Sequence, residues 1–102
     1  MRFDDSTEFQ WDKGNQEKNW LKHQVLYNEC EEVFFDDINI IFKDPLHSQN
    51  ENRKIIFGKT KKLRQLTVVF TLRNKKVRII SARDASKKEK IIYEKKASNT
   101  KI

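Results

Sequence analysis

The chain has 102 residues, of which 36% are hydrophobic and 36% are charged, so we expect one domain with a modest core. Residues 1–51 hold 5 Lys and Arg against 12 Asp and Glu, whereas residues 52–102 hold 17 against 3, giving net charges of −7 and +14. This split predicts a cationic working face, and nucleic acid is the commonest polyanion to meet one. No run of about 18 apolar residues is present, which excludes a membrane-spanning helix.

The acidic half predicts a short strand followed by two helices. Phe9 to Trp11 read as the strand, and the pattern from Asn15 to His23 is helical. Asn28 is expected to cap a second short helix, because Glu31 follows three residues later as in a capping box. Cys30 is the only cysteine, which excludes an internal disulfide and fits a reducing cytoplasm; we expect it to be a small core residue of that helix.

The following segment changes to a period of two, which predicts strands. Leu66, Val68 and Phe70 line one face of one such strand while Val69 partly covers the other, so we expect that strand to be central. Residues 73–75 form the turn to the next strand. The expected strands cover residues 38–42, 54–59, 64–72 and 77–82.

A final helix begins after Ser86, which forms a capping box with Glu89, and is expected to run to about Lys96. Consecutive strands with short turns predict an α+β fold: a short N-terminal strand, two helices, a four-stranded antiparallel meander and a C-terminal helix. We expect one domain over residues 1–96 and a frayed polar tail over 97–102.

A metal site is not expected. His23 and His47 lie far apart in sequence, there is no CxxC or HExxH motif, and the carboxylates gather in the half away from the basic one. The glycine-rich motifs of nucleotide cofactors are also absent. Metal-free chemistry on RNA remains possible, because the RNA supplies its own nucleophile, the 2′-hydroxyl. The protein then has to stabilise charge on the phosphate and move protons.

Several residues fit these roles, although each also has a structural explanation. Strict alternation puts Arg78 and Arg83 on opposite faces of their strand, so they share a site only if the strand ends or bends before Arg83. Trp11 and Trp20 are expected in the core rather than as stacking platforms for bases. The candidates are Arg53, Arg64, Arg73, Arg78, Arg83, Lys22, His23, Glu89 and Tyr93, with Lys59 as a further RNA contact.

Two parts of the sequence resemble the BrnT family. In the first half these are Phe9-Gln10-Trp11-Asp12, Lys18-Asn19, Lys22-His23 and Glu31-Glu32-Val33-Phe34. The C-terminal signature is stronger: Val77 to Arg83, then Ser86 to Glu89, and Tyr93. The resemblance covers roughly residues 9–95 and departs from many members at Asn15, where they carry a Lys.

The resemblance implies a toxin of a type II toxin–antitoxin pair with a RelE-like fold, which cleaves RNA without a metal or other cofactor and inhibits translation in the cytoplasm. The implied partner is a BrnA-like ribbon-helix-helix antitoxin in a 2:2 complex, which alone contacts operator DNA. By this resemblance Arg53, Arg78 and Arg83 form the active face, and Lys22, His23 and Tyr93 fall on family positions. With the basic residues of the sheet, we expect the catalytic residues to be Lys22, His23, Arg53, Arg83 and Tyr93, and the RNA contacts to be Lys59, Arg64, Arg73 and Arg78.

Two hypotheses follow from the residues and the resemblance together. In the first, Arg53 and Arg83 hold the scissile phosphate while Lys22, His23 or Tyr93 handle protons. In the second, the chain is a non-catalytic basic module that binds nucleic acid or protein and has a degenerate toxin site, which the departure at Asn15 favours. Neither predicts where the antitoxin docks.

Overall fold

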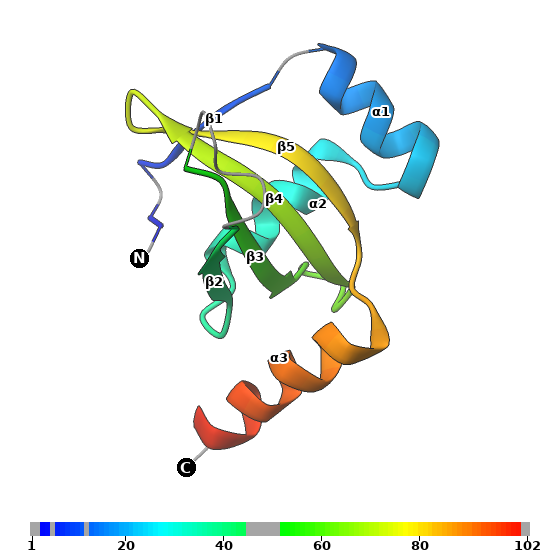
Figure 1. Cartoon of the computed structure of the whole chain (residues 1–102), viewed down its shortest axis with the longest axis vertical. Coiled ribbons are helices and arrows are strands. Elements are labelled where there is room, and N and C mark those ends of the chain that lie inside the picture. The colour runs from blue at the N-terminus through cyan, green and yellow to red at the C-terminus, as the bar shows by residue number, and fades with distance from the viewer. Residues whose placement is uncertain (1–2, 5, 12, 45–51, 101–102) are drawn as a thin grey trace.

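The structure, a computed structural model, describes residues 3–4, 6–11, 13–44 and 52–100. A single sheet organises the chain, with α1 beside its last strand and α3 crossing below it (Figure 1). The α+β class expected from the sequence is confirmed. In chain order the elements are β1 (Glu8–Gln10), α1 (Lys13–His23), α2 (Tyr27–Glu32), the 3-10 turn η1 (Val33–Phe35), β2 (Ile40–Lys43), β3 (Lys54–Lys59), β4 (Gln65–Arg73), β5 (Lys76–Asp84) and α3 (Lys87–Thr100).

The sheet has five strands in the order β1-β5-β4-β3-β2. Strands β2 to β5 pair antiparallel with their neighbours in sequence, as the short turns predict, and β4 is central. The sheet is nevertheless mixed, because β1 pairs parallel with β5, with Phe9 opposite Val77. The sequence predicted β1 but not its partner, since a parallel pair needs a long connection that leaves no local signal.

The core lies on the face of the sheet that carries Leu66, Val68 and Phe70, all fully buried; we call it the core face. The ring of Phe34 packs edge-on to that of Phe70, with 4.9 Å between centroids. Gly58 lets η1 press onto β3, because a Cβ at this position would lie 2.8 Å from the Cβ of Val33. The α2 and η1 segment is therefore held tightly against the sheet.

The start of the second helix differs from the expectation. The helix begins at Tyr27, and the backbone N–H of Leu26 donates to Oε1 of Glu29 at 3.1 Å. Asn28 and Glu31 therefore do not form the predicted capping box. Half of a capping box is thus made by Glu29 alone, with Leu26 at the cap position, and a pattern that requires a polar cap side chain does not detect it.

The two tryptophans have different environments. Trp20 is 48% exposed on α1, so its predicted place in the core is wrong. Trp11 is partly buried against the core, and its indole N–H donates to Glu31 at 2.8 Å. Cys30 is fully buried on α2, which confirms its prediction as a core residue.

The C-terminal half follows the sequence more closely. Asn74 and Lys75 form the two-residue β4–β5 turn with φ of 51° and 65°. Ser86 and Glu89 form the predicted capping box, since each backbone N–H donates to the other's side chain. Helix α3 runs past the expected end at Lys96 to Thr100, because Ala97 packs into a buried position.

Candidate active site

The outer face of the sheet, opposite the core face, carries Thr67, Val69 and Thr71 of β4. Side chains of directly paired residues project from the same face of a sheet. The residues of β5 that pair with these three are Arg83, Ser81 and Arg78. Two basic side chains of β5 are thus presented on the outer face together.

A β-bulge in β5 makes this possible. Val69 pairs with Ser81 and Phe70 pairs with Ile79, so Ile80 is an extra residue without a partner in the register. Strict alternation would have sent Arg78 and Arg83 to opposite faces. The structure thus meets the condition under which the sequence allowed these two arginines to share a face.

Arg83 is held by one carboxylate. Its Nη1 and Nη2 donate to Oε1 and Oε2 of Glu89 at 2.7 and 2.8 Å, and Nη1 also donates to the carbonyl of Asp84 at 3.2 Å. This two-point pair fixes the plane of the guanidinium. The side chain is 45% exposed, so a fixed positive charge reaches solvent from the outer face.

Glu89 is itself fixed by three donors. Its Oε1 accepts hydrogen bonds from Arg83, from the hydroxyl of Thr67 at 2.8 Å and from the backbone N–H of Ser86 at 2.8 Å. These bonds, chiefly that from Arg83, lower the pKa of Glu89 to about 2. An ionised carboxylate with so low a pKa is a poor proton acceptor near neutral pH. Glu89 can position Arg83, but it is unsuited to act as a general base.

Arg64 lies at the same end of the sheet but points into the protein. Its guanidinium donates to Asp84 at 2.6 and 3.0 Å, to Glu29 at 3.2 Å, and to the carbonyls of His23 and Gln24 at 3.2 and 3.0 Å. Hydrogen bonds to Asp84, above all, raise the pKa of Arg64. This Arg64 cluster ties the end of α1 and the start of α2 to β5, so the structure places Arg64 as a link between these elements.

Lys22 and His23 lie exposed at the last turn of α1. The helix is anchored beside β5, because Oδ1 of Asn19 accepts the backbone N–H of Ala82 at 3.2 Å. His23 approaches the end of β5 closely enough for its charge to contribute to the lowered pKa of Asp84, which is due mainly to Arg64. The structure thus brings Lys22 and His23 to the strand end that carries Arg83.

Tyr93 is buried. It is 2% exposed, and its hydroxyl donates to Oδ2 of Asp36 at 2.6 Å. Burial raises its pKa above the ordinary value. Lys59 lies over its ring with 5.3 Å from Nζ to the centroid and pairs with Glu94 at 3.4 Å. Tyr93 and Lys59 therefore join α3 to the sheet. Lys59 pairs with Gln65, so it lies at the same end of the sheet as Arg83, with its ammonium directed to Tyr93 and Glu94.

Arg53, Arg73 and Arg78 lie at the opposite end of the outer face, which we call the hairpin end. Arg78 pairs with Thr71, whose hydroxyl donates to the carbonyl of Asn52, next to Arg53, at 3.3 Å. Arg73 is the last residue of β4. The four residues from Thr67 to Thr71 span roughly 13 Å of strand. The positions of Arg53 and Arg83 are therefore well separated along the sheet, whereas the first hypothesis places both side chains at one phosphate.

The described residues offer little for metal chemistry. No group of three or more His, Cys, Asp or Glu among them could hold a metal ion. Burial raises the pKa of the Cys30 thiol to about 12, so it is a poor nucleophile. His47 lies outside the described residues. No helix in the described part of the chain is long and apolar enough to cross a membrane.

A family model decides the relationship of this chain. The model describing the ribonuclease toxin BrnT of type II toxin–antitoxin systems matches residues 11–89. The chain belongs to this family. The matched BrnT region contains both Arg83 and Glu89, whereas Tyr93 lies beyond it.

A solved structure shows the same fold. The 1.1 Å crystal structure of the Brucella abortus ribonuclease toxin BrnT superposes with a TM-score of 0.62 at 20% identity, covering 80% of this chain and 100% of that one. At this identity the likeness supports the BrnT fold alone. The comparison with curated proteins gave no match.

At the Arg83 end the reading of the sequence missed Thr67 and named Glu89 as a candidate without its contact to Arg83. Thr67 left a weak signal, because it alternates with Val69 and Thr71 on the second face of the central strand. Glu89 was assigned to the helix cap, and the cap does form. Its second role, holding Arg83, was hidden because a helix cap already accounts for a glutamate at this spacing.

Proposed function

We propose that this BrnT-family chain cleaves RNA without a metal, with Arg83 stabilising the charge that develops on the scissile phosphate, and that this cleavage inhibits translation in the cytoplasm. One observation carries the proposal: a guanidinium fixed at two points by Glu89 is half exposed on the outer face of the sheet. A donor held in place before reaction stabilises a transition state most effectively.

The reaction then follows from RNA chemistry. The 2′-oxygen of the RNA bonds to the adjacent phosphorus, and the bond from phosphorus to the 5′-oxygen breaks, giving a 2′,3′-cyclic phosphate and a 5′-hydroxyl. A base removes the proton of the 2′-hydroxyl, and an acid delivers a proton to the leaving oxygen. Lys22 and His23 are the exposed candidates for these transfers. Tyr93 is not used, because its hydroxyl is buried and bonded to Asp36.

The hairpin end supplies the second contact with RNA in this proposal. Arg53 and Arg78 lie roughly 13 Å along the strands from the Arg83 end, and Arg73 lies roughly 20 Å from it. A single RNA strand crossing the outer face would place a neighbouring phosphate against these arginines while Arg83 holds the reacting one. Their contacts would contribute to affinity and to its dependence on salt rather than to the chemical step.

The family implies an antitoxin partner. We propose that it is a ribbon-helix-helix protein of the BrnA type in a 2:2 complex, which alone contacts operator DNA. Binding of the antitoxin would then switch off cleavage and repress the shared promoter.

The test compares purified wild-type protein with Arg83→Ala on single-stranded RNA, with and without EDTA. Wild type is expected to release fragments ending in a cyclic phosphate at the same rate in both buffers. Binding of RNA without cleavage by folded wild-type protein would instead establish the non-catalytic module. Cleavage that EDTA abolishes would contradict the metal-free mechanism.

A further inference from the structure

The free edge of the sheet lies along β2. In the described residues β2 pairs with β3 on one side and with no strand on the other. Its pairing with β3 is regular, and its sequence Ile40-Ile41-Phe42 carries no charge before Lys43. Proteins usually protect such an edge with charges, bulges or a covering element, because its unpaired backbone groups can accept another strand.

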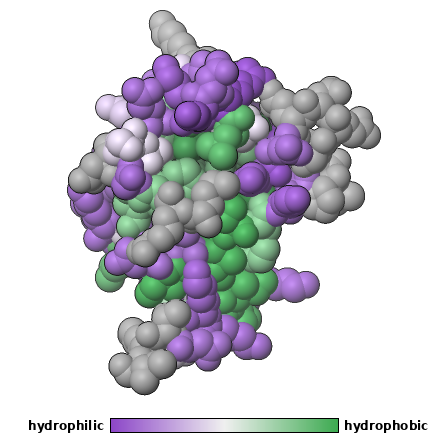
Figure 2. Space-filling view, turned by 90° about the vertical axis from the view of Figure 1, so that its left-hand side faces the viewer, coloured by the Kyte–Doolittle hydropathy of each residue, from purple (hydrophilic) through white to green (hydrophobic). Residues whose placement is uncertain are grey.

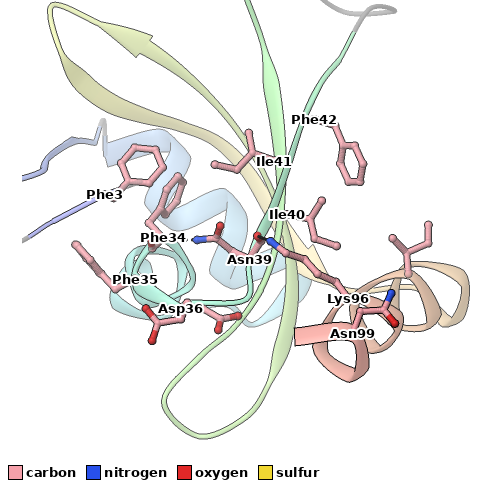
Figure 3. Close-up of a pocket in the computed structure, with 12 residues that line it drawn as sticks. Phe3, Phe34, Phe35, Asp36, Asn39, Ile40, Ile41, Phe42, Lys96 and Asn99 are labelled. Atoms are coloured by element: carbon pink, nitrogen blue, oxygen red, sulfur yellow. Dashed lines mark hydrogen bonds between the residues drawn. The ribbon is translucent and has the colours of Figure 1, made fainter. Parts of the chain in front are cut away.

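A cavity of ≈ 860 Å³ follows this edge, between β2, η1 and α3. It is lined from both faces of the strand: Ile41 with Phe3 and Phe34 on the core side, and Ile40 with Phe42 on the outer side (Figure 3). Ile92 of α3 also lines it. We call it the edge groove. Because alternate side chains of a strand point to opposite faces, an added strand would place its own side chains in both halves of the groove.

The groove exposes apolar surface. Phe35 is 43% exposed, and Phe42 and Ile92 are each 39% exposed. Figure 2 shows an apolar area on this side of the molecule with hydrophilic residues above it and at its flanks. Exposed apolar surface of this kind, rimmed by polar residues, marks a site for a protein partner.

The floor of the groove is held in shape before any partner binds. Nζ of Lys96 donates to the carbonyl of Asn39 at 2.6 Å, which ties α3 to the turn before β2. The side-chain amide of Asn39 donates to the carbonyls of Val33 and Phe34 at 3.3 and 3.2 Å. A partner would therefore lose less conformational entropy of the toxin on binding.

RNA does not fit this groove. Asp36 and Asp37 lie along it, and Lys96, which directs its ammonium to Asn39, is the one basic side chain in its described lining. The carboxylates repel phosphate, and apolar walls do not replace its hydration. A protein segment does fit, because its backbone satisfies the strand edge and its apolar side chains fill the two halves.

We propose that the edge groove is a docking site for the antitoxin, which adds an extended segment with apolar side chains to β2 as a sixth strand. Membership of the BrnT family requires such a partner, whatever the details of the cleavage site. Main-chain hydrogen bonds to β2 provide affinity, and the two apolar halves select the segment. A chain entering here lies against the sheet whose outer face carries Arg83, so its continuation can cover that face.

The first experiment measures the affinity of the paired antitoxin, expressed from the same operon, for toxin variants. Ile92→Lys places a charge in the groove, while Ile91→Lys changes the neighbouring helix residue, 52% exposed and outside this groove. Ile92→Lys is expected to weaken binding by about 30-fold, and Ile91→Lys by less than about threefold. Equal affinity of the two variants would overturn the proposal.

The second experiment identifies strand addition directly. Amide hydrogen exchange of the toxin, alone and with antitoxin, is compared over residues 40–43. Added protection in the complex is expected there, because the outward amides of β2 gain partners. Unchanged exchange over these residues in the complex would overturn the proposal, as would toxin dimers that protect β2 without antitoxin.

The cleavage assay separates this proposal from the one for RNA. Ile92→Lys and Phe42→Lys, a second variant in the edge groove, are expected to keep the wild-type rate of RNA cleavage when antitoxin is absent. Leu72→Lys, at a β4 position that is also 39% exposed, is the control for Phe42→Lys in binding. A toxin that binds antitoxin through β2 but does not cleave RNA would refute the proposed reaction and leave the docking site standing.

Discussion

Arg64 and Arg83 lie at the same end of the sheet, and each forms a two-point pair with a carboxylate, Asp84 or Glu89. The difference lies in what else surrounds them. Arg64 is 28% exposed and also bonds Glu29 and two backbone carbonyls, so its donors face protein. Arg83 is 45% exposed and is held from one side. Two neighbouring arginines thus differ in role. Arg64 joins elements of the fold, whereas the guanidinium of Arg83 is accessible to a ligand.

Replacing Arg83 should have the largest effect. Arg83→Ala is expected to lower the rate of RNA cleavage by about 10²–10³, because the developing charge on phosphate loses its fixed donor. Single-turnover rates at saturating RNA measure this directly. The unfolding transition should shift less than it does in Arg64→Ala, since Arg83 is 45% exposed and bonds one carboxylate. A rate within a factor of about three of wild type would remove Arg83 from the site.

Replacing Arg64 should reverse this pattern. Arg64→Ala leaves Glu29 and Asp84 without their shared partner and is expected to lower the free energy of unfolding by about 2–3 kcal/mol. Urea denaturation measures the loss as a lower midpoint. Below the unfolding transition the cleavage rate should stay near that of wild type. A large loss of rate in fully folded Arg64→Ala would show that the Arg64 cluster takes part in RNA binding.

Glu89→Gln tests whether the orientation of Arg83 matters beyond its charge. The amide keeps the size of the side chain but cannot hold the guanidinium at two points, so a roughly tenfold fall in kcat is expected. Glu89→Asp, which restores charge but shortens the side chain, should recover part of the rate. Ser86→Ala is the control, because it removes the cap without touching Arg83 and should cost about 1 kcal/mol of stability with little change in kcat.

The smallest expected effect is on stability at acid pH. The pKa of Glu89 is about 2 in the folded protein, against an ordinary 4.5, so its ionised form stabilises the fold. That stabilisation is complete above about pH 4.5 and is lost as pH falls toward about 2. The difference in unfolding free energy between wild type and Glu89→Gln should therefore be constant at neutral pH and shrink over this window. A difference that is flat down to pH 2 would contradict the lowered pKa.

The sequence predicted the sheet better than the site. Alternation over Leu66, Val68 and Phe70, with Val69 on the second face, was enough to place the central strand, because burial on both faces leaves a local pattern. Ser86 and Glu89 likewise identified the last helix from four residues. Such features depend on neighbours in sequence.

The site depends on residues far apart in sequence, which explains what the sequence left open. Arg64 meets Glu29 across 35 residues, and Tyr93 meets Asp36 across 57, so neither burial nor pairing could be predicted locally. The bulge at Ile80 has no glycine or proline to mark it. The family resemblance correctly identified the toxin class, whereas the relative positions of Arg53 and Arg83 follow from strand pairing that no short stretch of sequence encodes.

The bulge at Ile80 also decides which positions of β5 are buried and therefore tolerate substitution poorly. Before it, the buried positions are Val77 and Ile79, with even spacing; after it, the buried position is Ala82. In a scan of all substitutions along β5, the positions where substitution lowers stability most should therefore have odd residue numbers before Ile80 and an even residue number after it. Deleting Ile80 would remove the extra residue and leave Ala82 on the core face and Arg83 on the outer face, because Ile79 and Ser81 already pair with adjacent residues of β4.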